Sequence, residues 1–570
     1  MTEVGPVLRL AILADLAPGR GAQPRRSLDR QRYDEVLAAT APELLLLVPD
    51  ALADGPPRSV SLRFATWRDF SPAGLADQVP ALARARELLE RLAAGDADRE
   101  RLARDAEGVA PAAWRESLLR GDGNGGASPA DTGAERAAKA PAQAGGDVDA
   151  ILDLVSRDAG DATARSARRA VLGLVSRPPR GARASGLAGA SAELARRLGA
   201  QLDALYGAPA LRDLARAWTG LHWLVGRTDF REEIAMEVVA APVDAAADAV
   251  RALGEGSDVD VVIAAYEHDA SARDLERVRA LGGAGEEIQA VVVTGLAPEF
   301  FAVDSWDALR RGESPRARFA GEGFAGWRSL RESESARWLV LVANRLAIRG
   351  RYGAEGESTR GLVFEEAAPG GLMDTGAWGV AATLVRSWAR TRAPVQLSGT
   401  RHGLLPDLPL LDRGEGPSPV EGGFGNERRE DLEAIGLTAL QRYQRDVAFL
   451  GTVRTFHAPE KYPDPEATAD AAQQVTLAYQ VLASRLVKLL GRLLPDLVGL
   501  SRDEASQALR AAVVKHFSRP GAPLSADRVG IELRDHEDDA QLTAVALRVQ
   551  PELQVAGRPV NILLAFAARL

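Results

Sequence analysis

Three short apolar runs alternate with helical patterns in the middle of this 570-residue chain. The runs are Ala235–Val239, Val259–Ala264 and Ala290–Val293, and their β-branched residues favour strands. Helical patterns at 243–253 and 271–281 separate them. Strand–helix–strand alternation is typical of a largely parallel sheet covered by helices. The sequence therefore predicts a mainly α/β core in this region.

The beginning of the chain has a similar mixed character. Val7–Leu13 and Ser59–Phe64 have partly alternating apolar patterns, which predict strands. Asp29–Ala41 predicts a helix between them, with an N-capping aspartate and a proline directly after its end. We expect residues 1–118 to form a compact mixed unit.

The stretch Gly121–Gly146 differs in composition from both sides. It consists mainly of Gly, Ala, Ser, Pro, Asp and Gln without apolar periodicity, as in a flexible tether. The sequence therefore predicts three parts: an N-terminal domain over 1–120, a flexible linker over 121–146 and a large region over 147–570.

Charge, cysteine content and hydropathy exclude several classes of protein. Asp and Glu (79) outnumber Lys and Arg (70), giving a net charge of −9 and no general attraction to nucleic acid. The absence of cysteine excludes disulfides, thiolate metal sites and cysteine nucleophiles. The N-terminus does not resemble a secretory signal. The longest aliphatic run, Leu44–Val48, is far shorter than the roughly 20 residues that span a bilayer. We expect a soluble, cytoplasmic protein without membrane insertion.

Tests for catalytic motifs give no site. Gly321, Gly323 and Gly326 match the bare dinucleotide fingerprint, but no clear strand precedes them and Trp327 follows at once, which favours a loop. The histidines show no pair at the helical spacing of metal ligands, and no phosphate-loop or nucleophile-elbow motif is present. The sequence predicts no catalytic residue, no cofactor and no metal site, and therefore not an enzyme.

Short motifs follow one another in a fixed order along the chain. In the first hundred residues they are Leu13–Leu16, Tyr33–Val36, Trp67–Pro72 and Gln78–Leu82. Further on they are Ala217–Val225, Arg227–Glu232, Ala297–Ser305, Trp327–Glu334, Arg351–Gly353, Asn426–Leu432, Pro459–Tyr462 and, more loosely, Leu547–Pro551. The first group resembles the small subunit of the type VI secretion contractile sheath (TssB, or VipA). The second group resembles its partner, the large subunit (TssC, or VipB).

This resemblance implies that two normally separate sheath subunits are fused in one chain. The family implies a structural subunit that polymerises with itself into a helical sheath around an inner-tube protein, contacts baseplate components and ejects the tube by contraction. It also implies recycling by an AAA+ unfoldase of the ClpV type. The energy of such a stroke lies in two packings of the same subunits, so no residue has to perform chemistry.

One candidate site is a short helix after the linker. Val148, Ile151, Leu152 and Val155 fall at i, i+3, i+4 and i+7 and therefore lie on one helical face. The resemblance implies that this place corresponds to the unfoldase-binding helix of the large subunit, presented as a helix-in-groove ligand. The alternative is an ordinary amphipathic helix packed on its own domain.

A second candidate lies in the last of the two closing strands that the sequence predicts, Leu542–Gln550 and Val560–Ala567. Val560, Ile562, Leu564 and Phe566 share one face of it. An exposed strand edge needs a cover, and a neighbouring subunit's strand would provide one. We expect this strand to pair between subunits. The alternative is an ordinary central strand of its own domain.

Three departures from the family keep other functions open. Because the pattern of the core strand begins at Val7, we expect the N-terminal arm strand of small sheath subunits to be missing. The glycine-rich approach to the strand at Val259 is absent, and the fusion makes the candidate unfoldase helix internal. One alternative is a non-contractile collar or adaptor with the same fold. Another is a soluble α/β enzyme with a deep pocket, which would be a monomer or small oligomer.

Overall fold

The computed structural model describes residues 7–96, 98–120, 186–256, 258–354, 356–360, 362–535 and 542–569. The chain divides into two compact units, which we describe separately. The sheet unit comprises Met1–Ala51, Gly55–Ala83 and Gly199–Leu570, and the helical unit comprises Leu52–Asp54 and Arg84–Leu198. The predicted linker 121–146 and the candidate helix with Val148, Ile151, Leu152 and Val155 lie outside the described residues.

A nine-stranded sheet forms the centre of the sheet unit, in the order β11-β15-β14-β8-β7-β6-β1-β5-β2. The strands are β1 (Leu8–Ala14), β2 (Arg26–Leu28), β5 (Ile234–Ala240), β6 (Val261–His268), β7 (Val291–Leu296), β8 (Leu339–Ala343), β11 (Leu404–Leu405), β14 (Thr438–Gln444) and β15 (Val447–Leu450). Neighbours from β14 to β5 pair in parallel, whereas β2, β11 and β15 pair antiparallel at the two sides. The predicted α/β core is confirmed.

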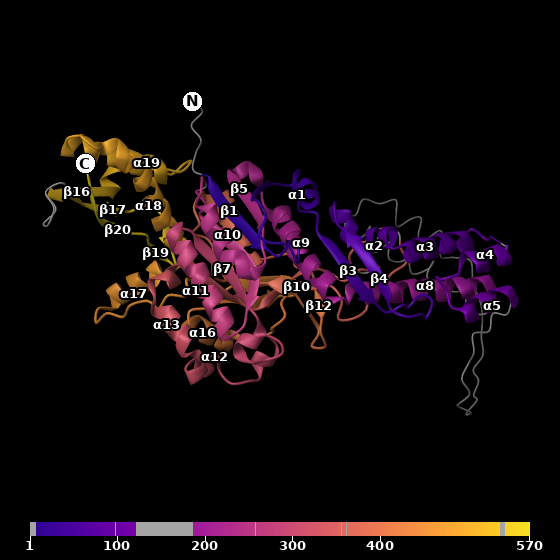
Figure 1. Ribbon diagram of the computed structural model, residues 1–570. Helices are drawn as coiled ribbons and strands as arrows, with labels where there is room; N and C mark the ends of the chain where they lie inside the picture. The colour runs from indigo at the N-terminus through magenta and orange to yellow at the C-terminus, as the bar shows by residue number, and fades with distance from the viewer. Residues whose placement is uncertain are drawn as a thin grey trace, which may run out of the picture. The chain divides into compact units, whose positions relative to one another are not determined.

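The N-terminal strand β1 lies inside this sheet, between β5 and β6. Figure 1 shows β1 beside β5. Leu10 pairs with Met236 on one side and with Val261 on the other. Residues 1–118 therefore do not form the compact unit of their own that we expected. The physical reason is burial: from Leu10 to Ala14 every residue of β1 is buried, as in a strand covered on both faces. The predicted domain boundaries at 120 and 147 remain a prediction. Strands from both sides of these boundaries nevertheless form one sheet.

Helices cover both faces of the central sheet. Those of the sheet unit are α1 (Tyr33–Thr40), α2 (Pro72–Gln78), α9 (Pro209–Arg227), α10 (Ala246–Leu253), α11 (Ala272–Glu287), α12 (Pro315–Phe319), α13 (Ala325–Glu332), α14 (Ala377–Thr391), α15 (Gly399–His402), α16 (Asn426–Ala434), α17 (Pro465–Gln474), α18 (Leu477–Leu497) and α19 (Arg502–Phe517). Side chains of α10, α11 and α13 share one buried apolar cluster with alternate residues of the strands, such as Leu13, Val262 and Val292. α14 contributes nothing to that cluster, yet it contacts β6 and β7 and packs against α9.

Smaller sheets and 3-10 turns complete the sheet unit. Two-stranded ribbons are formed by β3 (Glu43–Val48) with β4 (Arg58–Arg63), β9 (Arg345–Arg349) with β10 (Leu372–Thr375), β12 (Leu411–Asp412) with β13 (Pro417–Ser418), and β18 (Gln554–Val555) with β19 (Arg558–Pro559). The 3-10 helices span Trp67–Phe70, Phe230–Glu232, Val243–Ala245, Pro298–Phe301, Ala308–Arg310, Glu322–Phe324, Glu334–Trp338 and Ala526–Arg528.

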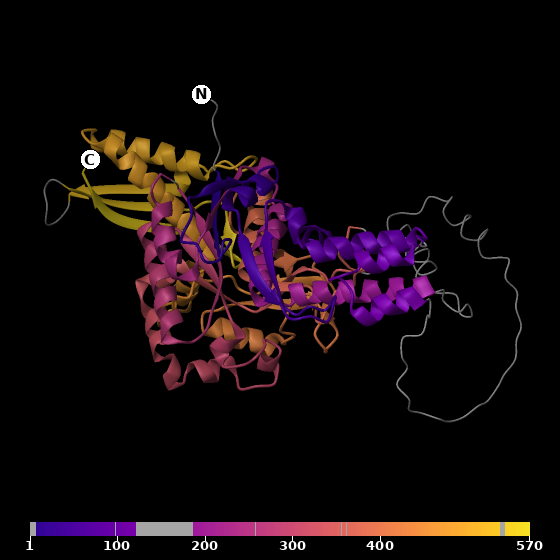
Figure 2. The same ribbon diagram turned by 45° about the vertical axis from the view of Figure 1, so that its right-hand side comes forward.

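A separate antiparallel sheet lies near the C-terminus, in the order β16-β17-β20 (Figure 2). Its strands are β16 (Val529–Asp535), β17 (Thr543–Val549) and β20 (Ile562–Ala568). α19 packs against β16 and covers one face. The two closing strands predicted from the sequence are thus confirmed, although the last one begins two residues later than expected.

The helical unit contains α4 (Arg99–Asp105), α5 (Ala112–Arg120) and most of α3 (Pro80–Ala93) and α8 (Gly186–Tyr206). The indole Nε1 of Trp114 on α5 donates to the carbonyl oxygen of Ala190 on α8 at 3.1 Å. Arg197 forms an ion pair of 3.0 Å with Asp54. This unit therefore joins helices from both sides of the predicted linker.

Candidate functional site

The C-terminal sheet has an open edge along β20. This strand pairs with β17 along its whole length, from Ile562 with Val549 to Ala568 with Thr543. Its other side has no strand partner among the residues that the structure describes. The backbone N–H and C=O groups on that side are available to another strand, which is the usual template for pairing between chains.

Three of the four residues predicted for this strand lie on β20. Ile562 is buried and Leu564 and Phe566 are half-buried, all on the face shared with the core. Val560 was placed wrongly: it precedes β20, and its N–H donates to the carbonyl oxygen of Leu553 at 3.0 Å. The turn through β18 and β19 therefore holds Val560, which is 1% exposed, outside the strand.

The other face of β20 is exposed. Leu563 has 63% of its surface accessible, and Ala565 and Ala567 on the same face are also exposed. A strand that combines a free edge with an exposed leucine and small side chains can be approached closely by a second chain. This is the feature of the C-terminal sheet most suited to contact with another molecule.

Residues of the small-subunit-like motifs contact residues of the large-subunit-like motifs inside the sheet unit. The ring of Trp67 stacks on His222 with centroids 4.1 Å apart and an interplanar angle of 7°. The Tyr33 hydroxyl donates to the carbonyl oxygen of Trp218 at 2.8 Å, and Trp218 Nε1 donates to the carbonyl oxygen of Leu16 at 3.1 Å. Burial lowers the pKa of His222, so the ring is neutral near pH 7. These motif residues are held in packing and not in a reactive arrangement.

The glycine of the same motif on α9 allows a close helix contact. A Cβ atom on Gly220 would come within 2.4 Å of the Trp378 indole on α14. Trp378 is fully buried, and its Nε1 donates to the Asp374 carboxylate at 2.8 Å. The absence of a side chain at Gly220 thus sets the distance between α9 and α14.

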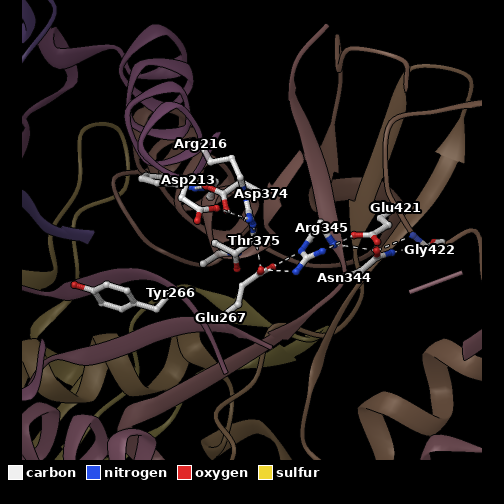
Figure 3. Close-up of polar contacts among 12 residues, drawn as sticks. Asp213, Arg216, Tyr266, Glu267, Asn344, Arg345, Asp374, Thr375, Glu421 and Gly422 are labelled. Atoms are coloured by element: carbon white, nitrogen blue, oxygen red, sulfur yellow. Dashed lines mark hydrogen bonds and ion pairs between the residues drawn. The ribbon is translucent and has the colours of Figure 1, made fainter. Parts of the chain in front are cut away.

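A buried network of charges lies where β6 and β8 end (Figure 3). The Arg345 guanidinium bonds both oxygens of Glu267, at 2.6 and 2.7 Å, and reaches Glu421 at 3.1 Å. Arg216 on α9 contacts Glu267 at 3.1 Å and Asp374 at 3.2 Å. The network joins α9, β6, β9, β10 and the loop after β13.

The charges of this network set the protonation of its members. Burial alone would raise the pKa of Glu267, but Arg345 and Arg216 outweigh burial and hold that pKa below its ordinary value. Burial raises the pKa of Asp374 against the opposing effect of Arg216. Because arginines neutralise these carboxylates, the network is suited to fixing the fold and not to proton transfer.

The sequence analysis did not find this network. Its members are far apart in the chain, and nothing local marks them as partners. A weak signal was present, since Glu267 lies at the carboxyl end of the apolar strand β6 and Arg345 comes two residues after the buried strand β8. Charged residues in that position lie at the same edge of a parallel sheet.

The structure places Gly321 directly before the 3-10 helix Glu322–Phe324, Gly323 within that helix and Gly326 in the first turn of α13. Trp327, which follows Gly326, is 1% exposed and packs edge-on against Phe300 at 4.8 Å. The loop predicted from the sequence is therefore wrong for Gly323 and Gly326, which lie in helical turns, and the element that precedes Gly321 is α12 and not a strand. Within the described residues, no group of three or more His, Cys, Asp or Glu side chains could hold a metal ion, and no helix is long and apolar enough to cross a membrane.

Comparison with known proteins identifies both parts of the chain. Residues 8–108 match the family "Type VI secretion system, VipA, VC_A0107 or Hcp2". Residues 252–456 match the VipB family, "EvpB/VC_A0108, tail sheath N-terminal domain". The type VI secretion system sheath protein TssC1 of Pseudomonas aeruginosa strain PAO1 is 24% identical over 347 residues, which cover 55% of this chain and 70% of TssC1.

Solved structures give a weaker likeness. The sheath tail protein of Desulfitobacterium hafniense has 10% identity and a TM-score of 0.33, and the alignment covers 58% of this chain and 61% of that one. The sheath of the extracellular contractile injection system PVC in its contracted state has 8% identity and a TM-score of 0.34, over 62% of this chain and 77% of that one. At these TM-scores the likeness adds nothing to the argument.

The α/β fold and the family matches define a structural subunit of a contractile sheath. Proteins of this class polymerise with copies of themselves, and their role is structural. More specifically, residues 8–108 match the small-subunit family (TssB, or VipA) and residues 252–456 match the large-subunit family (TssC, or VipB) of the type VI secretion sheath, so the chain combines segments similar to both subunits. The expected resemblance to both families is therefore confirmed.

Proposed function

We propose that this chain polymerises into a helical sheath around an inner-tube protein by adding a neighbour's strand to the free edge of β20. The observation that carries this proposal is the unpaired side of β20 within the described residues, next to the exposed Leu563. Pairing there would satisfy the open backbone groups and cover apolar surface at once. One chain then provides the functions of both sheath subunits.

The remaining partners follow from the family. The sheath assembles in the cytoplasm, contacts baseplate components at one end, and ejects the inner tube when the subunits change from one packing to another. The segment with Val148, Ile151, Leu152 and Val155 serves as the handle for an AAA+ unfoldase of the ClpV type. No step of this cycle requires a catalytic residue in the chain.

Proline substitutions along β20 test the strand addition. In an antiparallel strand, backbone N–H groups of successive residues point to opposite edges, so one of Leu564 and Ala565 faces β17 and the other faces the open side. Leu564→Pro and Ala565→Pro should therefore differ. One should lower the stability of the folded chain, and the other should leave stability unchanged but abolish sedimentable polymer.

The matched control is Leu563→Ala, which removes exposed apolar surface without removing a backbone donor. It should reduce polymer yield less than the proline at the open edge. Polymer formation by both proline variants at the level of the unsubstituted chain would contradict strand addition at β20. Rings or short stacks in place of tubes would favour the collar or adaptor alternative.

A further inference from the structure

The ribbon of β3 and β4, which lie side by side in Figure 1, has an exposed apolar face. Leu45 is 77% exposed and Leu47 is 74% exposed, and both lie on the same face of β3 because strand residues alternate between faces. The opposite face is covered, since Leu44, Leu46 and Val48 are buried. The ribbon therefore presents two neighbouring leucine side chains to its surroundings.

The sequence of β3 is typical of a strand that is buried on both faces. A strand with one open face alternates apolar and polar residues, whereas Leu44–Val48 is an uninterrupted aliphatic run. The partner strand β4 does alternate: Ser59 pairs with Leu47 and Ser61 pairs with Leu45, and both serines are exposed. The two leucines therefore stand above short polar side chains. An apolar surface of this kind indicates that another molecule covers it.

The C-terminal sheet has a second open face with an exposed leucine. Leu563 on β20 is 63% exposed. Leu45, Leu47 and Leu563 are the large aliphatic residues that are exposed on the strands of the described chain. Beside Leu563, the same face carries the directly paired Ala565 of β20 and Ala546 of β17, both exposed. These short side chains allow a second sheet to approach to the distance of about 10 Å that is usual for packed sheets.

We infer that the β3–β4 ribbon of one copy packs face to face on the C-terminal sheet of a second copy, with Leu45 and Leu47 against the surface around Leu563. This inference rests on the proposed polymerisation and names a second contact within it. A strand that is added at the β20 edge extends the sheet sideways and leaves its open face uncovered. The two contacts therefore do not compete for the same surface.

The partner is a second copy because of how the two faces can combine. Both faces belong to the sheet unit and are open in it, so they do not cover each other within one copy. Contact between two ribbons would be isologous, and such a contact closes a pair of molecules and goes no further. Contact between two different faces is heterologous, and repeated heterologous contacts build a helical polymer. The ribbon and the C-terminal sheet are therefore the pair of faces that extends the proposed assembly.

Threonine substitutions on the ribbon test this contact. Leu45→Thr combined with Leu47→Thr keeps strand propensity and removes the exposed apolar surface. This double variant should raise the critical concentration for polymer formation at least about tenfold, measured by sedimentation. The matched control is Val363→Thr, because Val363 is 81% exposed and lies in a loop outside both sheets. The control should leave the critical concentration unchanged, and both variants should keep the unfolding midpoint of the unsubstituted chain.

Crosslinking identifies the face that the ribbon contacts. The chain has no cysteine, so Leu47→Cys and Ala565→Cys introduced together give each copy one thiol on each face. Assembled chains treated with a short bismaleimide should form a ladder of covalent multimers, because each copy binds one neighbour through each face. Leu47→Cys alone should remain monomeric on a denaturing gel.

Several results would overturn the inference. Dimers from Leu47→Cys alone would show that two ribbons pair with each other. A lowered unfolding midpoint of the double threonine variant would show that its own chain covers the leucines. Polymerisation of that variant as well as the control, or polymer without intermolecular crosslinks, would exclude the contact while leaving the β20 edge to the proline variants. Absence of polymer from the unsubstituted chain would instead overturn the proposed function.

Discussion

Arg345 holds together the buried charges at the end of β6 and β8, and its removal should destabilise the chain strongly. Arg345→Met keeps much of the side-chain volume but leaves Glu267 and Glu421 without their shared partner. Breaking a buried ion pair from one side costs about 3–5 kcal/mol. Side-chain exposure is 20% for Arg345, 13% for Glu267 and 5% for Glu421, so water cannot replace the lost contacts. Because Arg216 still contacts Glu267, we expect a loss near the lower limit, about 3 kcal/mol.

The loss should depend on pH, and its sign follows from the pKa of Glu267. In the native chain this pKa lies below the unfolded value near 4.5, so ionised Glu267 adds stability at neutral pH that is lost in acid. Without Arg345, burial raises the pKa, and the folded state binds the proton more readily than the unfolded state. The difference in stability between native chain and variant should therefore shrink as the pH falls from 7 towards 5.

Urea unfolding followed by circular dichroism, on chains diluted below the concentration at which they polymerise, measures this difference at both pH values. Arg231→Met is the control, because Arg231 pairs with Asp229 at the surface and its side chain is 89% exposed. Since water and salt screen such a pair, the control should leave the free energy of unfolding nearly unchanged. A loss for Arg345→Met as small as the control's, or one that is the same at pH 7 and pH 5, would refute the role assigned to the network.

Further substitutions test the packing and the open edge. Gly220→Ala places a methyl group against the Trp378 indole and should cost about 1–3 kcal/mol in urea unfolding, whereas an unchanged midpoint would show that α9 and α14 are not tightly packed. Trp218→Phe removes the hydrogen bond to the carbonyl oxygen of Leu16 and should cost about 1–3 kcal/mol, measured in the same way; no loss would mean that this bond is not maintained in solution. Leu563→Asp should leave the free energy of unfolding within about 0.5 kcal/mol, yet reduce sedimentable polymer, because a charge beside an open strand edge opposes pairing. Normal polymer yield from Leu563→Asp would contradict an interface at β20.

The strands of the core could be predicted from sequence because their signals are local. Val259–Ala264 and Ala290–Val293 begin within two residues of the starts of β6 and β7, and α/β alternation followed from them. The order of strands could not be predicted in the same way. β1 lies between β5 and β6, more than two hundred residues away in the chain, and its own pattern does not specify its neighbours.

The candidate site residues, too, could be predicted only where their sequence signal is local. The last strand was recognised from its apolar alternation, but its start was misplaced because the backbone of Val560 bonds to Leu553 in the preceding turn. The ion network was missed because Glu267, Arg345 and Glu421 come together only when the sheet, the β9–β10 ribbon and a loop are assembled. Family motifs located Trp67 and His222 correctly as marks of both sheath subunits, yet only the structure shows that the two rings stack.

The central claim is that one chain performs the work of both sheath subunits. Negative-stain electron microscopy of the purified full-length chain, alone and with its inner-tube protein, tests this most directly. The account predicts long tubes with a cogwheel-like cross-section, formed without any separate small subunit. Uniform small particles under both conditions would contradict it.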